Sequence, residues 1–165
     1  MTRVNTIEPQ DISDQALMAF YRELPMIHGA LNRSLRKWFE CGRTIVSADE
    51  LGIPPTYRLN AGHVKFFYDK KQYLATQWNL LIKELAARKY NIDPVGRTVN
   101  WSIFDHVEQT AWSPDSVAHK INIDRLVERL YRRPDWYTYY GQPINVDKWV
   151  SYWYDKYCDD NKEIA

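Results

Sequence analysis

Hydrophobic residues recur at helical spacing in several stretches of the chain, and nowhere do they keep the strict alternation of a strand. In the clearest stretch, from Asn60 or Gly62 to about Arg88, apolar side chains return every three or four positions. These side chains are Val64, Phe67, Tyr68, Leu74, Trp78, Leu81 and Leu85. No internal repeat is visible. The pattern therefore predicts an all-α protein.

The N-terminal part of the chain predicts one long, interrupted helix. It runs from about Asp14 to about Cys41, with capping residues such as Ser13 before it and Gly42 as its stop. Pro25 lies inside this range. Because proline lacks a backbone donor and its ring clashes with the preceding turn, we expect a kink or a break near Leu24.

The second half of the chain is less regular. Residues 91–119 show no sustained period, so they predict mainly irregular structure. Asn122 or Asp124 is expected to cap a third helix that continues to about Arg132. A fourth helix is predicted from Asp147 to about Cys158.

Composition limits the class of protein. The length of 165 residues fits one domain. Aromatic residues make up 15% of the chain, more than a core of this size needs, so aromatic side chains are expected on the surface. Lys and Arg number 22 against 21 Asp and Glu, a net charge of +1. This balance excludes binding of nucleic acid through a strongly basic composition, and any site for a polyanion must come from local clustering.

Cysteine usage and hydropathy bear on the setting of the protein. Cys41 and Cys158 have no metal-ligand spacing and are too few for a disulfide framework. The chain contains no stretch of 18 uninterrupted apolar residues, and its N-terminus carries acidic residues where an apolar leader would be. We therefore expect no metal site, no membrane segment and a cytoplasmic protein with reduced thiols.

The N-terminus offers a candidate nucleophile. Methionine before a small residue is normally removed, which would leave a free α-amine on Thr2. Such an amine titrates at about 7.7–8.0, well below lysine, so part of it is neutral and nucleophilic at physiological pH. A retained Met1 would block Thr2, and most processed proteins make no chemical use of this amine.

One face of the first predicted helix is polar. Its members are Gln15, Ala16, Ala19, Arg22, Glu23 and Met26. A glutamate beside an arginine in a helix is usually solvated surface. Glu23 becomes a catalytic candidate only if a nucleophile lies opposite it.

Basic residues cluster at two places in the chain. The clusters are Arg33, Arg36, Lys37 and Arg43 on the first predicted helix, and Arg125, Arg129, Arg132 and Arg133 on the third. An aromatic segment, WYTYYG, follows the second cluster and contains Trp136, Tyr137 and Tyr140. This combination is typical of a surface that contacts phosphates and bases. It is equally typical of a solvated helix face beside aromatic side chains that pack in the core.

Four stretches of the chain match one family in the right order. They are MTRVN at 1–5, LMAFYRELP at 17–25, AGHVKFFYDK at 61–70 and RRPDWYTYYG at 132–141. Through them the chain resembles the pyrimidine-dimer DNA glycosylase/AP lyase family, the small phage and viral ultraviolet-damage endonucleases called endonuclease V of the denV type. The resemblance spans most of residues 1–144 and implies one all-α domain with three main helices, followed by an extension over 145–165.

The resemblance implies a mechanism without metal or cofactor, on double-stranded DNA that contains damaged bases. The Thr2 amine would attack the sugar of the damaged nucleotide, expel the base and form an imine, after which β-elimination would cut the strand. Glu23 matches the family carboxylate that stabilises the cationic intermediates and assists the proton transfers. By the same resemblance, the enzyme kinks the duplex and extrudes a nucleotide opposite the lesion. We expect a monomer in the cytoplasm of a bacterial or phage-infected cell.

Further positions match the family's DNA contacts. They are Arg3, Gln15, Arg22, Arg125, Arg129 and Arg133. Trp136, Tyr137 and Tyr140 lie in the matching stretch 132–141 and are expected to contact bases. Met26 stands where the prototype has arginine, and Ala16 where it has histidine. Two polar contacts around the lesion are thus absent, although Arg33 or Arg36 could offset the loss.

Two alternatives stay open. The same chemistry could act on another damaged or modified base, or the chain could be a non-catalytic DNA-binding relative. In the extension, Trp149, Trp153 and Tyr157 form a stripe at helical spacing. Its simplest interpretation is a helix packed back on the domain, and the second is a helix that binds a partner.

Overall fold

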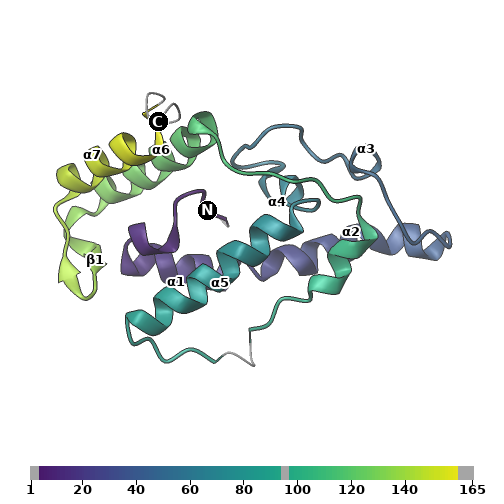
Figure 1. The fold of residues 1–165 in the computed structure, drawn as a ribbon, viewed down its shortest axis with the longest axis horizontal. Coiled ribbons are helices and arrows are strands. Elements are labelled where there is room, and N and C mark those ends of the chain that lie inside the picture. The colour runs from purple at the N-terminus through teal and green to yellow at the C-terminus, as the bar shows by residue number, and fades with distance from the viewer. Residues whose placement is uncertain (1–3, 94–96, 160–165) are drawn as a thin grey trace.

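The computed structural model describes residues 4–93 and 97–159, and it confirms the all-α prediction (Figure 1). Its helices are α1 Asp14–Glu23, α2 Met26–Glu40, α3 Ala48–Leu51, α4 His63–Phe66, α5 Lys71–Ala87, α6 Ser116–Arg132 and α7 Val146–Tyr157. Three short 3-10 helices cover Pro9–Asp11, Trp101–His106 and Pro134–Trp136. The strands β1 Thr138–Tyr139 and β2 Gln142–Pro143 pair antiparallel as a minimal hairpin.

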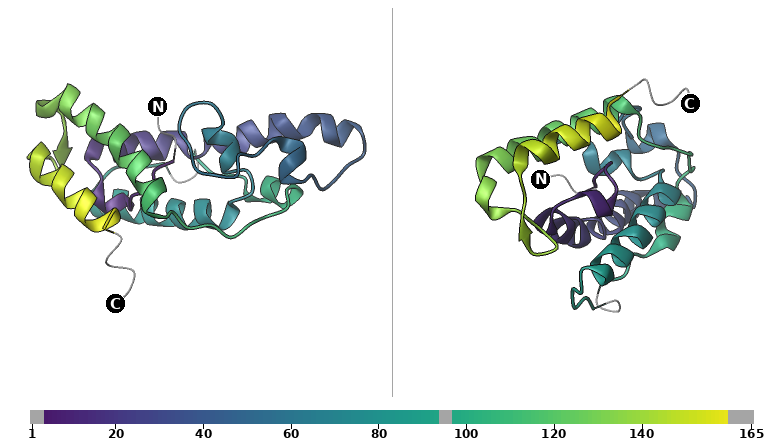
Figure 2. Two further views of the ribbon diagram at one scale, coloured as in Figure 1. Left: turned by 90° about the horizontal axis from the view of Figure 1, so that it is seen from above. Right: turned by 60° about the vertical axis from the view of Figure 1, so that its left-hand side comes forward.

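The helices are arranged around the N-terminal segment. Figures 1 and 2 show α6 and α7 side by side as an antiparallel pair, connected by the hairpin. The segment that leads into α1 lies between this pair and the layer formed by α1 and α5. Among the described residues, no helix is long and apolar enough to cross a membrane.

The predicted break in the first helix is confirmed. The Ser13 hydroxyl accepts a hydrogen bond from the Ala16 N–H at 3.2 Å and caps α1. The helix ends at Glu23, and Pro25 is the N-cap of α2. Because proline has no N–H to donate, the helical ladder stops before it and resumes after it.

The prediction of one helix from about residue 60 to Arg88 is wrong, because the chain leaves the helix between Phe67 and Lys70. At this point Asp69 accepts hydrogen bonds from Thr110, which lies outside the helix. Its carbonyl accepts the Thr110 N–H at 2.9 Å, and its carboxylate accepts the Thr110 hydroxyl at 2.9 Å. A contact 41 residues away in sequence thus replaces local helical bonds, which hydrophobic spacing cannot foresee.

The predicted start of the third helix is also wrong. Helix α6 begins at Ser116, with the Asp115 carboxylate accepting the Ala118 N–H at 2.7 Å as its cap. Asn122, expected as a cap, lies inside the helix with 0% of its surface exposed. Its side chain binds the N-terminal segment instead. For the fourth helix, Asn145 is the cap, and its side chain accepts the Lys148 N–H at 3.0 Å.

Candidate active site

The N-terminal segment is anchored inside the molecule. Val4, Asn5, Thr6 and Ile7 are each at most 3% exposed. A buried backbone must find hydrogen-bond partners, and here side chains from three helices supply them. These bonds fix the chain immediately after the residue expected to carry the nucleophile.

Side chains of α4, α5 and α6 each bind this segment. The Val4 N–H donates to Nε2 of His63 at 3.3 Å, and the Tyr73 hydroxyl donates to the Asn5 carbonyl at 2.9 Å. Oδ1 of Asn122 accepts the Thr6 N–H at 2.9 Å and the Thr6 hydroxyl at 3.2 Å. Buried bonds of this kind are costly to break, so the segment is held in one position.

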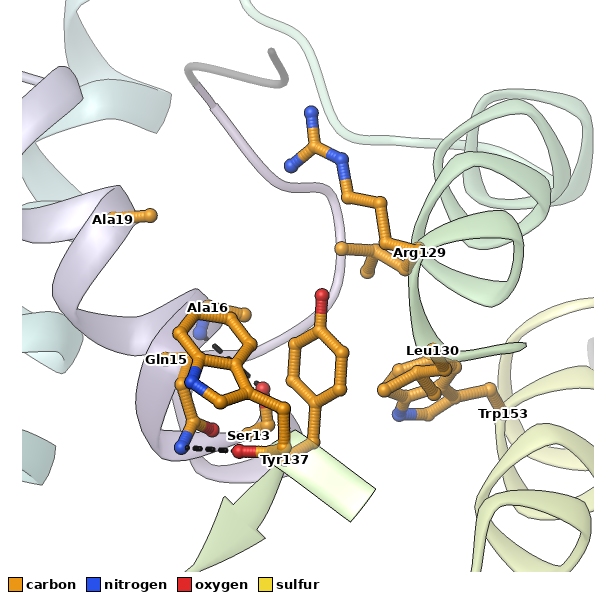
Figure 3. A pocket seen from close by; sticks show the side chains of 10 residues that line it. Ser13, Gln15, Ala16, Ala19, Arg129, Leu130, Tyr137 and Trp153 are labelled. Carbon is orange, nitrogen blue, oxygen red and sulfur yellow. Dashed lines mark hydrogen bonds between the residues drawn. The ribbon is translucent and has the colours of Figure 1, made fainter. Parts of the chain in front are cut away.

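A cavity of about 190 Å³ opens beside this segment, between α1 and α6 (Figure 3). Its lining is Ser13, Gln15, Ala16, Ala19, Leu126, Arg129, Leu130, Trp136, Tyr137 and Trp153. In Figure 3 the Tyr137 ring stands between α1 and α6, and its hydroxyl points to the side on which the Arg129 side chain extends. The site is thus mainly apolar, with one guanidinium at its edge.

Glu23 lies on the same face of α1 as Ala16 and Ala19, since these residues are three and four positions apart. It follows Ala19 by one turn, about 6 Å along the helix axis. Only 7% of Glu23 is exposed, whereas the preceding Arg22 is exposed. The interpretation of Glu23 as part of a solvated surface is therefore wrong.

Gln15 holds the aromatic segment against α1. Its Nε2 donates to the Trp136 carbonyl at 3.0 Å and to the Thr138 hydroxyl at 3.1 Å, and its Oε1 accepts the Thr138 N–H at 3.0 Å. Asp14 completes the attachment by accepting the Gly141 N–H at 2.9 Å. Gln15 therefore contributes to the site through the position of Trp136 and Tyr137. A direct contact between Gln15 and DNA stays a prediction.

The arginines of α6 have different environments. Arg129 borders the cavity, and Arg133 is exposed at the end of the helix. Arg125 and Arg132 both form ion pairs with Glu128, at 2.5 Å for Arg132. Glu128 was not among the residues expected in the site, although its spacing of three and four residues from the two arginines is the pattern of such pairs.

The aromatic segment divides in two. Trp136, 54% exposed, and Tyr137 border the cavity. Tyr140 turns to α5, where its hydroxyl donates to Glu84 at 3.1 Å and its ring lies 5.0 Å from the Arg88 guanidinium. The structure therefore does not bring Tyr140 together with the other two. Arg33 is likewise apart from the cavity, exposed on α2.

Burial keeps the Tyr137 hydroxyl protonated. Burial raises the pKa of the Tyr137 hydroxyl above its ordinary value, although Arg129 and Arg133 oppose the shift. At neutral pH the hydroxyl can therefore donate a hydrogen bond into the site. Among the described residues, no cluster of three or more His, Cys, Asp or Glu side chains is arranged to hold a metal ion. Thr2 and Arg3 lie outside the described residues.

A family model for the pyrimidine dimer DNA glycosylase matches residues 1–96. This match covers more than half of the chain and includes the N-terminal segment, α1 and α5. The chain belongs to the pyrimidine dimer DNA glycosylase family. As a member of this family of DNA repair glycosidases, it has DNA as its implied substrate. The cavity and the anchored N-terminal segment are therefore features of a DNA glycosylase, and part of the cavity comes from residues beyond the matched range.

Proposed function

We propose that the chain excises cyclobutane pyrimidine dimers from double-stranded DNA and then cuts the strand as a metal-independent AP lyase. The Thr2 α-amine is the nucleophile, and Glu23 is the catalytic carboxylate. The anchored N-terminal segment carries the proposal. Two residues of chain span at most about 7 Å, so the amine of Thr2 stays within about 7 Å of the Val4 nitrogen that His63 binds. A tethered nucleophile of this kind has little orientational freedom to lose on reaction.

The location of Glu23 supports its catalytic role. Burying a carboxylate costs folding free energy, and a negative charge at the C-terminal end of a helix opposes the helix dipole. Glu23 is 7% exposed and is the last residue of α1, so both penalties apply. These two costs support the proposal that Glu23 has a chemical role.

The proposed reaction begins when the neutral amine attacks C1′ of the damaged nucleotide. The C1′–N1 bond breaks, and the pyrimidine leaves with the electron pair and takes up a proton. The amine nitrogen gives up a proton as the C1′–O4′ bond opens, O4′ is protonated, and a protonated imine forms. Glu23 stabilises this cation and assists the transfer of these protons.

Strand cleavage and release of the enzyme follow. Removal of a proton from C2′ drives β-elimination, in which the electron pair shifts into the sugar chain and the 3′ phosphate leaves. Water then hydrolyses the remaining conjugated imine and regenerates the Thr2 amine. Arg22, Arg129 and Arg133 bind phosphates, Arg3 assists them near the lesion, and Trp136 and Tyr137 contact bases. No metal takes part in these steps.

Borohydride trapping tests the proposal, because borohydride reduces the imine to a stable covalent adduct. Protein whose N-terminus has been verified by mass spectrometry is incubated with irradiated, abasic and undamaged duplexes. We expect adducts with the first two and none with the third. Glu23→Gln should slow adduct formation on irradiated DNA roughly 100-fold or more. Glu108→Gln, which removes an exposed carboxylate between the second 3-10 helix and α6, should not.

The outcomes separate the alternatives. An adduct on the abasic duplex alone would keep the lyase chemistry and move the glycosylase to another base, in line with the exposed Met26 and the small Ala16 at the cavity. No adduct on either duplex, from correctly processed protein, would reject the amine mechanism. Normal adduct formation by Glu23→Gln would reject the role of that carboxylate.

A further inference from the structure

His63 belongs to a stretch that matches the family but has no role in the reaction described above. It is the first residue of α4, and only 3% of it is exposed. Its ring packs edge-on against Tyr57 and Phe67, with centroids 5.6 and 5.3 Å away. The imidazole is therefore fixed in the interior, beside the N-terminal segment.

The hydrogen bonds of His63 define its tautomer. Nδ1 lies 2.8 Å from the Arg58 carbonyl, and a carbonyl can only accept, so Nδ1 carries the proton. Nε2 of the neutral ring is then an acceptor, and it receives the Val4 N–H at 3.3 Å. Both ring nitrogens are thus used, one to orient the ring and the other to hold the chain.

The backbone before His63 is shaped for this orientation. Gly62 has a φ of 90°, a backbone conformation that residues other than glycine rarely adopt. A Cβ at Gly62 would meet Cγ of Pro54 at 3.0 Å and Cδ of Arg58 at 3.3 Å. The turn that delivers His63 to Val4 therefore requires glycine at this position.

We infer that His63 is a positioning residue for the nucleophile: as a neutral hydrogen-bond acceptor it fixes the Val4 amide, and through it the α-amine two residues earlier. This inference rests on the proposed function. Tyr73 holds Asn5 and Asn122 holds Thr6, whereas His63 binds Val4, the described residue nearest to Thr2. Losing the contact frees the Val4 amide, and a displacement of the amine by about 1 Å is enough to slow a reaction roughly 100-fold.

Two amide substitutions provide a matched test. In His63→Gln the side-chain amide reaches the position of Nε2 and can accept the Val4 N–H, whereas His63→Asn reaches only the position of Nδ1. Each variant is compared with the wild-type protein in single-turnover borohydride trapping on an abasic duplex. DNA affinity and melting temperature are measured in parallel. Leu81→Ala removes a buried side chain of α5 and leaves a cavity in the core, so it serves as the control for general destabilisation.

We expect His63→Asn to form adduct roughly 10- to 100-fold more slowly than wild type, with its DNA dissociation constant within threefold. His63→Gln and Leu81→Ala should stay within threefold of wild type in rate. The inference is overturned if His63→Asn is as fast as wild type, if both amides are equally slow, or if Leu81→Ala slows the reaction as much at a similar melting temperature.

Two further results complete the test. If the wild-type protein forms no adduct, the proposed function itself fails, and the inference fails with it. If His63→Asn does not fold, nitrogen NMR of the wild-type protein decides instead. Nε2 of His63 should be the unprotonated nitrogen and the Val4 amide should resist hydrogen exchange, whereas a protonated Nε2 or a rapidly exchanging Val4 amide overturns the inference.

Discussion

At the scale of single residues, Asp14 of α1 binds both the aromatic segment and Arg88, the C-cap of α5. Its side chain is 6% exposed and pairs with Arg88 at 2.9 Å, and it also accepts the Thr138 hydroxyl at 2.7 Å. Burial alone would raise the pKa of Asp14. The hydrogen bonds from Thr138, Gly141 and Arg88 outweigh burial and lower the pKa below its ordinary value.

This shift predicts how stability depends on pH. A carboxylate whose pKa is lowered by folding stabilises the folded state. This stabilisation is fully present above the unfolded pKa of about 4, and it is lost as the pH falls through the pKa of the folded state. Asp14→Asn should destabilise the protein by about 3–5 kcal/mol at pH 7, because Arg88 loses a buried partner. Urea unfolding should show a smaller difference between the two proteins at pH 2.5. An equal difference at both pH values would contradict the assignment.

Trp136 gives a second prediction at this scale. Its ring is 54% exposed at the edge of the cavity, where a base can stack on it. Trp136→Ala should weaken binding of damaged DNA by about 1–3 kcal/mol, with little change in melting temperature. Tyr131→Ala removes a ring of the same 54% exposure from α6 and is the control. Equal losses of affinity in the two variants would argue against stacking at Trp136.

At the scale of elements, α6 presents a basic face that one carboxylate partly neutralises. Glu128 accepts from both Arg125 and Arg132, and the hydrogen bond from Arg125 is the main reason that the pKa of Glu128 is lowered. Both arginines must leave Glu128, or share it, to bind phosphate. We therefore expect the helix to have less affinity for undamaged DNA than its four arginines suggest.

Removing this competitor should strengthen non-specific binding. Glu128→Gln is expected to lower the dissociation constant for undamaged duplex several-fold, and to steepen the dependence of log K on log salt by about 1–2. Fluorescence anisotropy across a salt series measures both. Asp124→Asn removes a carboxylate from the same helix, where it pairs with Lys120 at 3.0 Å. If both variants behave alike, the effect is one of net charge and does not come from the released arginines.

How much of each element could be predicted depends on the range of the interactions that form it. The break at Pro25 and the cap at Ser13 are local, and the sequence predicts both. The interruption of the second helix depends on Thr110, which no local pattern reveals. The site divides in the same way. Glu23 is proposed from a motif, and its role stays a prediction, whereas the anchoring roles of His63 and Asn122 appear only when residues 59 to 116 positions apart are brought together.

At the scale of the whole molecule, α7 closes the structure over the N-terminal segment. Nε1 of Trp153 donates to the Asp11 carbonyl at 2.7 Å, and Lys156 and the Tyr157 hydroxyl both contact the Asp11 carboxylate at 2.5 Å. Trp153 is 1% exposed and also borders the cavity. The helix is therefore part of both the core and the site.

This double role predicts the effect of truncating Trp153. Trp153→Ala should lower the free energy of unfolding by about 3–5 kcal/mol, the range for a large aromatic removed from a core. Tyr152→Phe, an exposed neighbour that loses only its bond to Asp11, should cost about 1 kcal/mol or less. Urea denaturation of both variants provides the comparison. A loss below about 1 kcal/mol for Trp153→Ala would mean that α7 is dispensable for the core.

The anchoring of the first residues by partners far along the chain also sets an order of events during synthesis. Thr6 binds Asn122, and the Glu8 N–H donates to the Tyr157 hydroxyl, 149 residues later. At roughly 5–20 residues per second, the ribosome needs about 6–24 s to reach Asn122. Until then the N-terminal segment cannot dock, and it stays open to the peptidase that removes methionine. The interior position of residues 4–7 is thus compatible with removal of Met1, because the peptidase can act while the chain is still growing, before Asn122 and Tyr157 are made and this segment is buried.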